Sequence, residues 1–174
     1  MKNTPFEIAI VGPECSGKTT LARELGKEFN APVIPEIARD YLSEIGKNYN
    51  LKDVNTIAQL QKSEALKFLE DKPETLIHDT EILTIKIWQE EKWQEPSALV
   101  MDLWEEQSFD LYLLCYPDLP WEDDGLRENP IDRERLFKIY EKQLKESNAT
   151  FTTISGLGPT RLEEAMQAVV NLRS

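Results

Sequence analysis

The chain has 174 residues, of which 40% are hydrophobic and 30% are charged, a composition typical of a soluble globular protein with enough chain for one domain. Its formal net charge of −12 argues against nucleic acid or an anionic membrane as the main partner, because both require a basic surface. No apolar run approaches the roughly 20 residues that span a bilayer, and residues 1–5 lead directly into a predicted strand rather than a secretion signal. We therefore expect a cytoplasmic protein whose two cysteines are free thiols.

A strand, a phosphate-binding loop and a helix follow one another at the start of the chain. Residues 6–11 read FEIAIV, a short apolar and β-branched run typical of a buried strand. Residues 12–19 read GPECSGKT and match G-x-x-x-x-G-K-[ST], the P-loop pattern. Residues 20–29 carry apolar side chains at helical spacing. Because the motif requires this order of elements, we expect it to bind the phosphates of a nucleoside triphosphate.

Each part of the P-loop has a chemical role. Gly12 and Gly17 allow the tight turn that points successive backbone N–H groups at phosphate oxygens. Lys18 reaches the β- and γ-phosphates as a point charge, and the Thr19 hydroxyl can ligate Mg²⁺. The residues predicted to contact the nucleotide are Gly12, Glu14, Cys15, Ser16, Gly17, Lys18, Thr19 and Thr20.

The rest of the chain alternates short strands with helices. Strands are predicted at 31–35, 75–79, 109–116 and 151–154. Helices are predicted at 37–45, from its cap Asp53 to about 70, at 81–93, 97–107, 132–147 and 160–172. Five strands separated by helices predict an α/β fold with a five-stranded parallel sheet covered on both faces. Ligands of such folds bind at the carboxyl ends of the strands.

Asp79 ends the third predicted strand and is our candidate for a second Mg²⁺ anchor beside Thr19. A carboxylate at this place supports the metal in P-loop proteins. The alternative is an Asp that caps a helix beginning at Thr80 or Glu81. We favour the metal role because the P-loop independently predicts a metal-bound triphosphate.

Glu36 follows the second predicted strand and could face an acceptor hydroxyl as a general base or orienting group. Glu36, Arg39 and Asp40 lie three and four residues apart, on one face of a helix. The alternative is an acidic helix start with a surface salt bridge, worth a few tenths of a kcal/mol. The residues alone leave these two interpretations equally open.

The polar loop after the fourth predicted strand contains Trp121 close to Asp123 and Asp124. The indole could stack on a base while the carboxylates bind ribose hydroxyls. The alternative is a solvated acidic turn with one buried Trp.

Three arginines follow, at positions 127, 133 and 135. They could close over the phosphates as a lid, residues 117–135, and stabilise the transferring charge. Arg127 and Arg133 are then catalytic candidates beside Lys18. The alternative is ordinary helix solubility.

Taken together, these residues resemble the nicotinamide riboside kinase domain of the bacterial multifunctional NAD-biosynthesis regulator, within the P-loop kinase superfamily. The resemblance covers nearly the whole of residues 1–174, read as one domain, and depends most on the stretch WEDDGLR at 121–127. It also rests on the P-loop at 12–19, on EIARD at 36–40 and on Asp79-Thr80. It implies a three-layer α/β/α sandwich with a short lid. It also implies that Glu36 and Arg39 line the acceptor side, with Trp121, Asp123 and Asp124 near the nucleoside and Asp79 supporting the metal.

The resemblance implies phosphorylation of nicotinamide riboside to nicotinamide mononucleotide with ATP and Mg²⁺. The acceptor 5′-hydroxyl would be oriented by Glu36 or Asp79. We keep two alternatives, a kinase for another nucleoside or deoxynucleoside and an ATP-binding sensor with little turnover. The expected partner is a small nucleoside, not nucleic acid or membrane, and homo-oligomerisation is left open.

Overall fold

The computed structural model describes residues 4–128 and 131–173, and this part of the chain contains five strands and seven helices. The strands are β1 (Phe6–Val11), β2 (Val33–Ile34), β3 (Thr75–Asp79), β4 (Leu111–Cys115) and β5 (Phe151–Ile154). The helices are α1 (Lys18–Glu28), α2 (Ile37–Ile45), α3 (Leu51–Glu70), α4 (Ile82–Trp93), α5 (Ala98–Glu106), α6 (Arg133–Glu146) and α7 (Pro159–Arg173).

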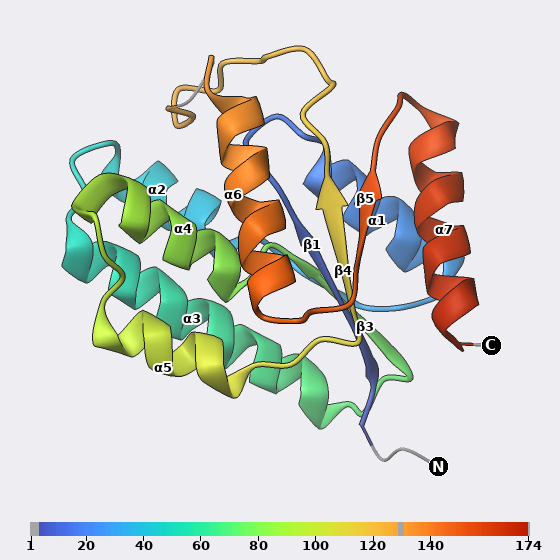
Figure 1. Cartoon of the computed structure of the whole chain (residues 1–174). Helices are drawn as coiled ribbons and strands as arrows, with labels where there is room; N and C mark the ends of the chain where they lie inside the picture. The colour runs from blue at the N-terminus through green and yellow to red at the C-terminus, as the bar shows by residue number, and fades with distance from the viewer. Residues whose placement is uncertain (1–3, 129–130, 174) are drawn as a thin grey trace.

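The strands form one parallel sheet in the order β2-β3-β1-β4-β5. In this register Ile8 of β1 pairs with Ile77 of β3 and Leu111 of β4. Parallel neighbours need crossover connections, and helices supply them on both faces. Figure 1 shows α1 and α7 on one side of the sheet and α4 and α6 on the other. The predicted three-layer sandwich with a five-stranded parallel sheet is confirmed.

The central strand β1 is buried on both of its faces because successive side chains point in opposite directions. Ile8 and Ile10 belong to the cluster that packs on α1 and α7. Ala9 and Val11 belong to the cluster that packs on α4 and α6. A further cluster joins α2, α3 and α5 to α4. The loops at the carboxyl end of β1 are therefore held by a strand whose last four residues are buried.

Two local expectations differ from the structure. The predicted strand over 31–35 is reduced to Val33–Ile34, because the flanking Pro32 and Pro35 have no N–H to donate to a ladder. The helix predicted to begin at Asp53 begins at Leu51. Its cap is Asn50, whose side chain accepts from the backbone N–H groups of residues 52 and 53, while Asp53 accepts from the Asn50 N–H at 2.9 Å. Asp53 therefore completes a capping box rather than starting the helix.

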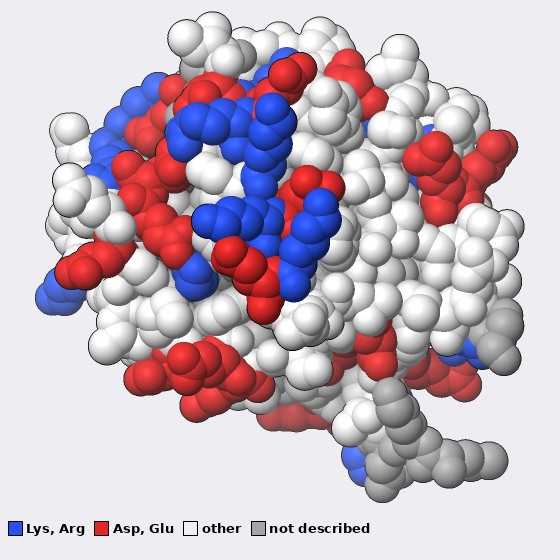
Figure 2. Space-filling model, in the orientation of Figure 1, with Lys and Arg blue, Asp and Glu red and all other residues white. Residues whose placement is uncertain are grey.

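Charges on the face drawn in Figure 2 are mixed. Lys and Arg side chains gather over α6 and the lid, and Asp and Glu side chains lie among them. Within residues 4–128 and 131–173, no helix is long and apolar enough to cross a membrane.

Candidate functional site

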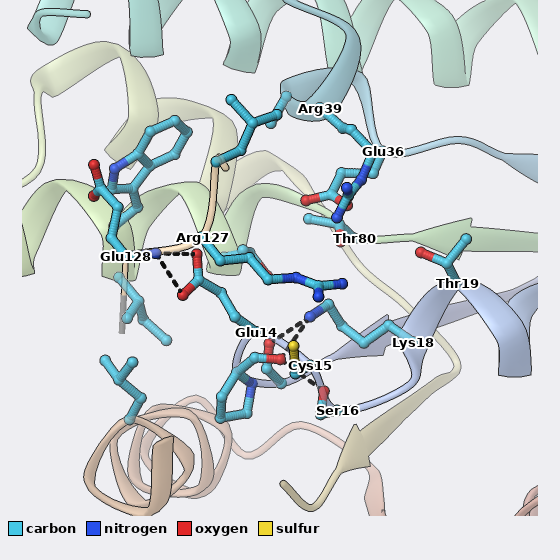
Figure 3. A pocket seen from close by; sticks show the side chains of 18 of the residues that line it. Glu14, Cys15, Ser16, Lys18, Thr19, Glu36, Arg39, Thr80, Arg127 and Glu128 are labelled. Carbon is cyan, nitrogen blue, oxygen red and sulfur yellow. Dashed lines mark hydrogen bonds and ion pairs between the residues drawn. The ribbon is translucent and has the colours of Figure 1, made fainter. Parts of the chain in front are cut away.

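The carboxyl ends of the strands open into a cavity of about 740 Å³. Its walls come from the P-loop, α2, α3, α4 and the lid, and Figure 1 shows the lid crossing above the end of β4. The eight predicted nucleotide contacts in the P-loop all line this cavity, and Figure 3 labels several of them. Glu36, Arg39, Asp124 and Arg127 line it as well, so the structure brings both predicted sides of the site together. The predicted lid includes residues 129 and 130, which lie outside the described residues.

Gly12 and Gly17 are glycines for geometric reasons. Gly12 has φ +140°, and a Cβ atom there would lie 2.6 Å from the carbonyl oxygen of Cys115. Gly17 has φ +78° and would place a Cβ atom 2.7 Å from Leu119 Cδ1. Both backbone conformations are unfavourable for other residues. The loop therefore packs against the end of β4 in a form that only glycine allows without strain.

Lys18 folds back over the P-loop. Its Nζ donates to the carbonyl oxygens of Gly12 at 2.9 Å and Pro13 at 2.8 Å. The Ser16 hydroxyl also donates to Pro13 O, at 2.7 Å. Figure 3 shows the ammonium group turned toward the loop. Since these contacts are hydrogen bonds to neutral carbonyls, a phosphate, which offers charged acceptors, competes for the ammonium group effectively.

Asp79 and Thr19 form a pair suited to Mg²⁺. Asp79 is 3% exposed, and its Oδ1 has no hydrogen-bond partner among the described residues. Burial raises the pKa of Asp79, and a hydrogen bond from Thr19 lowers it in part. No cluster of three metal-binding side chains occurs in the described part of the chain. One carboxylate and one hydroxyl nevertheless fit Mg²⁺, which takes its remaining ligands from phosphates and water.

The alternative role of Asp79, as a helix cap, is taken by another residue. Glu81 precedes α4, and its carboxylate accepts a hydrogen bond from Leu83 N at 2.8 Å. Between them, Thr80 lines the cavity with φ +76°, which is strained for a β-branched residue. The Thr80 hydroxyl is buried without a partner among the described residues. Such strain clusters at functional sites. The sequence indicated Thr80 only as part of the resemblance and gave it no role in the site.

The acceptor-side residues are tied to the lid. Arg39 Nη1 donates to Asp124 Oδ2 at 2.5 Å, and its Nε lies 3.7 Å from Glu36 Oε2. Burial alone would raise the pKa of Asp124. The hydrogen bonds from Arg39 and from the backbone N–H groups of Leu126 and Arg127 outweigh burial and lower that pKa to about 2. Asp124 is therefore charged at neutral pH and connects α2 to the lid.

The lid is also fastened to the P-loop. The backbone N–H of Glu128 donates to both carboxylate oxygens of Glu14, at 3.2 and 3.1 Å. Cys15 Sγ lies 3.3 Å from both the N and the O of Glu122. Arg133 Nη1 donates to the carbonyl oxygens of Cys15 at 3.3 Å and Leu119 at 2.8 Å. Arg133 therefore holds the P-loop, although it is not among the cavity-lining residues.

Trp121 and Asp123, two predicted nucleoside contacts, are not among the described residues that line the cavity. Asp123 accepts from Gly125 N at 2.8 Å within its own turn. Trp121 faces Arg133, whose guanidinium carbon is 5.9 Å from the ring centroid. Arg135 pairs with Glu91 and Asp132 instead of facing the P-loop. The nucleoside contacts of Trp121 and Asp123 stay predictions.

Arg161 of α7 joins three loops at the site, and no sequence pattern indicated it. It is 6% exposed and forms an ion pair with Asp118 of the lid. Its Nη2 donates to the carbonyl oxygens of Ser16 at 2.7 Å and Tyr116 at 3.0 Å. Its Nη1 donates to Gly156 O at 2.9 Å. A single buried guanidinium thus fixes the P-loop, the lid and the β5–α7 loop relative to one another.

A second group that the sequence did not indicate lies on the α4 side of the cavity. Tyr49, Trp88, Lys92 and Glu128 all line it. Trp88 Nε1 donates to the Tyr49 hydroxyl at 3.0 Å, and that hydroxyl donates to Glu128 Oε2 at 2.9 Å. The isolated positions of these residues in the sequence carry no motif, and only the fold brings them together.

Comparisons with known proteins agree with this architecture. The family model described as an AAA domain (AAA_28) matches residues 7–161. Two trifunctional NAD biosynthesis/regulator proteins NadR, from Salmonella typhimurium and Escherichia coli K12, are each 29% identical over 156 residues. These alignments cover 84% of this chain and 37% of each relative, so the chain corresponds to a minor part of those proteins.

Solved structures show the same fold. A NadR structure in complex with NAD and AMP-PNP has a TM-score of 0.83 at 20% identity, over 97% of this chain and 49% of that one. A NadR structure in complex with NR has a TM-score of 0.83 at 21% identity, covering 97% and 51%. A deoxyadenosine kinase from M. mycoides has a TM-score of 0.66 at 20% identity, covering 95% and 99%.

These findings confirm the P-loop kinase fold and the resemblance to the NAD-biosynthesis regulator. Because the family model matches residues 7–161, which are most of the chain, the chain belongs to the AAA domain (AAA_28) family, and it is homologous to NadR.

Proposed function

We propose that this protein is an ATP- and Mg²⁺-dependent kinase that phosphorylates the 5′-hydroxyl of nicotinamide riboside. The observation that carries the proposal is one cavity lined by both the P-loop and the Glu36–Arg39 pair of α2. Homology to NadR and a NadR structure with bound NR support this acceptor. A NadR structure with bound AMP-PNP supports ATP as the donor.

The chain's own residues divide the work of transfer. Lys18 exchanges the carbonyls of Gly12 and Pro13 for the β- and γ-phosphates. Glu36 accepts a hydrogen bond from the 5′-hydroxyl and orients it toward the γ-phosphorus. A bond forms between the 5′-oxygen and that phosphorus while the bond from phosphorus to the β–γ bridging oxygen breaks. The hydroxyl proton passes to Glu36, and ADP leaves.

The remaining groups prepare the site for this step. Thr19 and Asp79 would hold Mg²⁺, which supplies charge neutralisation to the phosphates when bound. Arg127 extends toward Lys18 in Figure 3 and would stabilise the transferring charge. The contacts of Glu14 with Glu128, and of Cys15 with Glu122 and Arg133, hold the lid over the P-loop. A closed lid excludes water, which would otherwise accept the phosphoryl group.

A second candidate is a kinase for another nucleoside or a deoxynucleoside. The deoxyadenosine kinase match favours it, because it covers 95% of this chain and 99% of the neighbour. Both candidates use the same P-loop and carboxylates, and they differ in the base that the acceptor end of the cavity receives.

Coupled measurement of ADP formation separates the candidates. Purified protein is given ATP, Mg²⁺ and, in turn, nicotinamide riboside and a panel of ribo- and deoxyribonucleosides. We expect the highest kcat/KM with nicotinamide riboside, and Lys18→Ala should remove turnover with every acceptor. Preferential use of a deoxynucleoside would replace the acceptor but keep the mechanism. ATP binding without transfer to any acceptor would overturn the kinase proposal in favour of a sensor.

A further inference from the structure

We infer that Tyr49, Trp88 and Glu128 form a subsite for a positively charged base, and that Lys92 occupies this subsite in the free protein. The inference rests on the proposed kinase function and identifies the part of the cavity that reads the acceptor base. It assigns the base to α4 and the α2–α3 loop, rather than to the Trp121 end of the lid.

The first observation is an ammonium group on an aromatic face inside the cavity. Lys92 Nζ lies 3.7 Å from the centroid of the Tyr49 ring and 5.8 Å from that of Trp93. The same Nζ lies 3.6 Å from Glu128 Oε1. An aromatic face with a carboxylate beside it is the arrangement that binds organic cations. Lys92 thus shows where a cation is stable in this cavity.

The second observation is that the ring and the carboxylate are held in place by their neighbours. The Tyr49 and Trp88 rings meet edge to face, with centroids 5.0 Å apart and planes at 72°. The Tyr49 hydroxyl is fixed between Trp88 Nε1 and Glu128 Oε2. The backbone N–H of Glu128 donates to Glu14, which anchors the backbone that carries this carboxylate. The subsite therefore stays assembled when its cation changes.

The third observation is the position of the subsite within the cavity. Figure 3 shows Glu128 on the side of the cavity away from Thr19 and Thr80, with Arg127 and Lys18 between them. Lys18, Glu36 and Glu128 all line the same cavity. With the phosphates on Lys18 and the acceptor hydroxyl at Glu36, the part of the cavity that Glu128 borders is open to the base.

The Lys92 side chain can leave the subsite readily when a ligand enters. Its side chain is 34% exposed, and long lysine side chains reorient in solvent at little cost. A pyridinium ring such as that of nicotinamide riboside carries the same charge and adds stacking area. A neutral base would remove Lys92 from Tyr49 and Glu128 without replacing its charge. The subsite therefore favours cationic bases over neutral bases of the same shape.

Calorimetric titration in the presence of AMP-PNP tests the inference without turnover. The two ligands are nicotinamide riboside, which is cationic, and its dihydro form, which is neutral and nearly the same shape. We expect the wild type to prefer the cation. We expect Glu128→Gln to weaken binding of the cation by about three- to tenfold while leaving the neutral ligand within twofold. We expect Lys92→Met to strengthen binding of the cation by a similar factor, because the competing ammonium is removed.

The matched controls are Lys142→Met and Glu146→Gln, which remove an exposed ion pair of 3.7 Å on α6 outside the cavity. Neither control substitution should change the affinity for nicotinamide riboside or for its dihydro form. The inference would be overturned if Glu128→Gln affected both ligands equally, or if Lys92→Met bound the cation more weakly than the wild type does. It would also be overturned if neither ligand bound. Charge-selective binding in a protein that phosphorylates no nucleoside would overturn the proposed function and leave the subsite standing.

Discussion

Replacement of Glu81 by glutamine should make the folded protein more stable, and more so as the pH rises. Glu81 is 2% exposed, and burial raises its pKa from 4.5 to about 7, although hydrogen bonds from Leu83 N and Gln107 lower it in part. Its Oε1 has no hydrogen-bond partner among the described residues. The unfolded chain keeps the ordinary pKa. Between pH 4.5 and 7 the folded state therefore binds more protons, and the free energy of unfolding falls as the pH rises.

The rise in the pKa of Glu81 corresponds to a loss of about 3 kcal/mol by pH 8, when the carboxylate is charged in both states. Glu81→Gln is neutral throughout and keeps an oxygen that can accept from Leu83 N. We expect the variant to gain on the order of 1–3 kcal/mol at pH 8 and little at pH 4.5.

Urea unfolding of both proteins at half-unit steps from pH 4.5 to 8, followed by circular dichroism, measures the difference. Glu146→Gln on the exposed face of α6 is the control, because it removes the same charge without burial. A difference between Glu81→Gln and wild type that does not change with pH would refute the reasoning.

Three further substitutions test the structure. Gly12→Ala places its Cβ 2.6 Å from Cys115 O at φ +140°. We therefore expect the free energy of unfolding in urea to fall by about 2 kcal/mol or more, and nucleotide binding to be lost. Wild-type nucleotide affinity in this variant would contradict the loop geometry. Asn50→Ala removes the α3 cap, and we expect the free energy of unfolding to fall by about 1 kcal/mol in the same assay. No change would show that the capping box contributes nothing to stability. Arg161→Lys keeps the charge, but a lysine cannot contact Ser16 and Asp118 together. We therefore expect a higher KM for ATP and an unchanged KM for the acceptor. An equal rise in both KM values would contradict a role confined to the nucleotide side.

Local patterns were sufficient to predict the sheet and the P-loop. Apolar runs such as residues 6–11 and 75–79 are short and bounded, and the strand–loop–helix order around Gly12 is encoded within about two dozen consecutive residues. The cap of α3 was misplaced because Asn50 and Asp53 are both good caps three residues apart, and the choice depends on backbone geometry.

The remaining parts of the site could not be predicted because they depend on tertiary contacts. Arg161 and Asp118 are 43 positions apart and carry no motif, yet they meet beneath the P-loop. Tyr49 and Glu128 are 79 positions apart and meet only because the lid folds onto α4. Trp121 was predicted as a base contact from its acidic neighbours, and that contact stays a prediction. The fold adds a neighbour that the sequence did not indicate, because the guanidinium carbon of Arg133 lies 5.9 Å from the Trp121 ring centroid. Composition identified the lid segment, and the fold decides which of its side chains face the cavity.

Phosphorus NMR of the wild-type protein with ATP, Mg²⁺ and nicotinamide riboside tests the central claim most directly, because it identifies the product rather than the loss of ATP. We expect a phosphomonoester resonance of nicotinamide mononucleotide that grows in step with ADP and is absent with Lys18→Ala. Conversion of ATP to ADP and inorganic phosphate, or no change in the spectrum, would contradict the claim that this cavity transfers a phosphoryl group to the nucleoside.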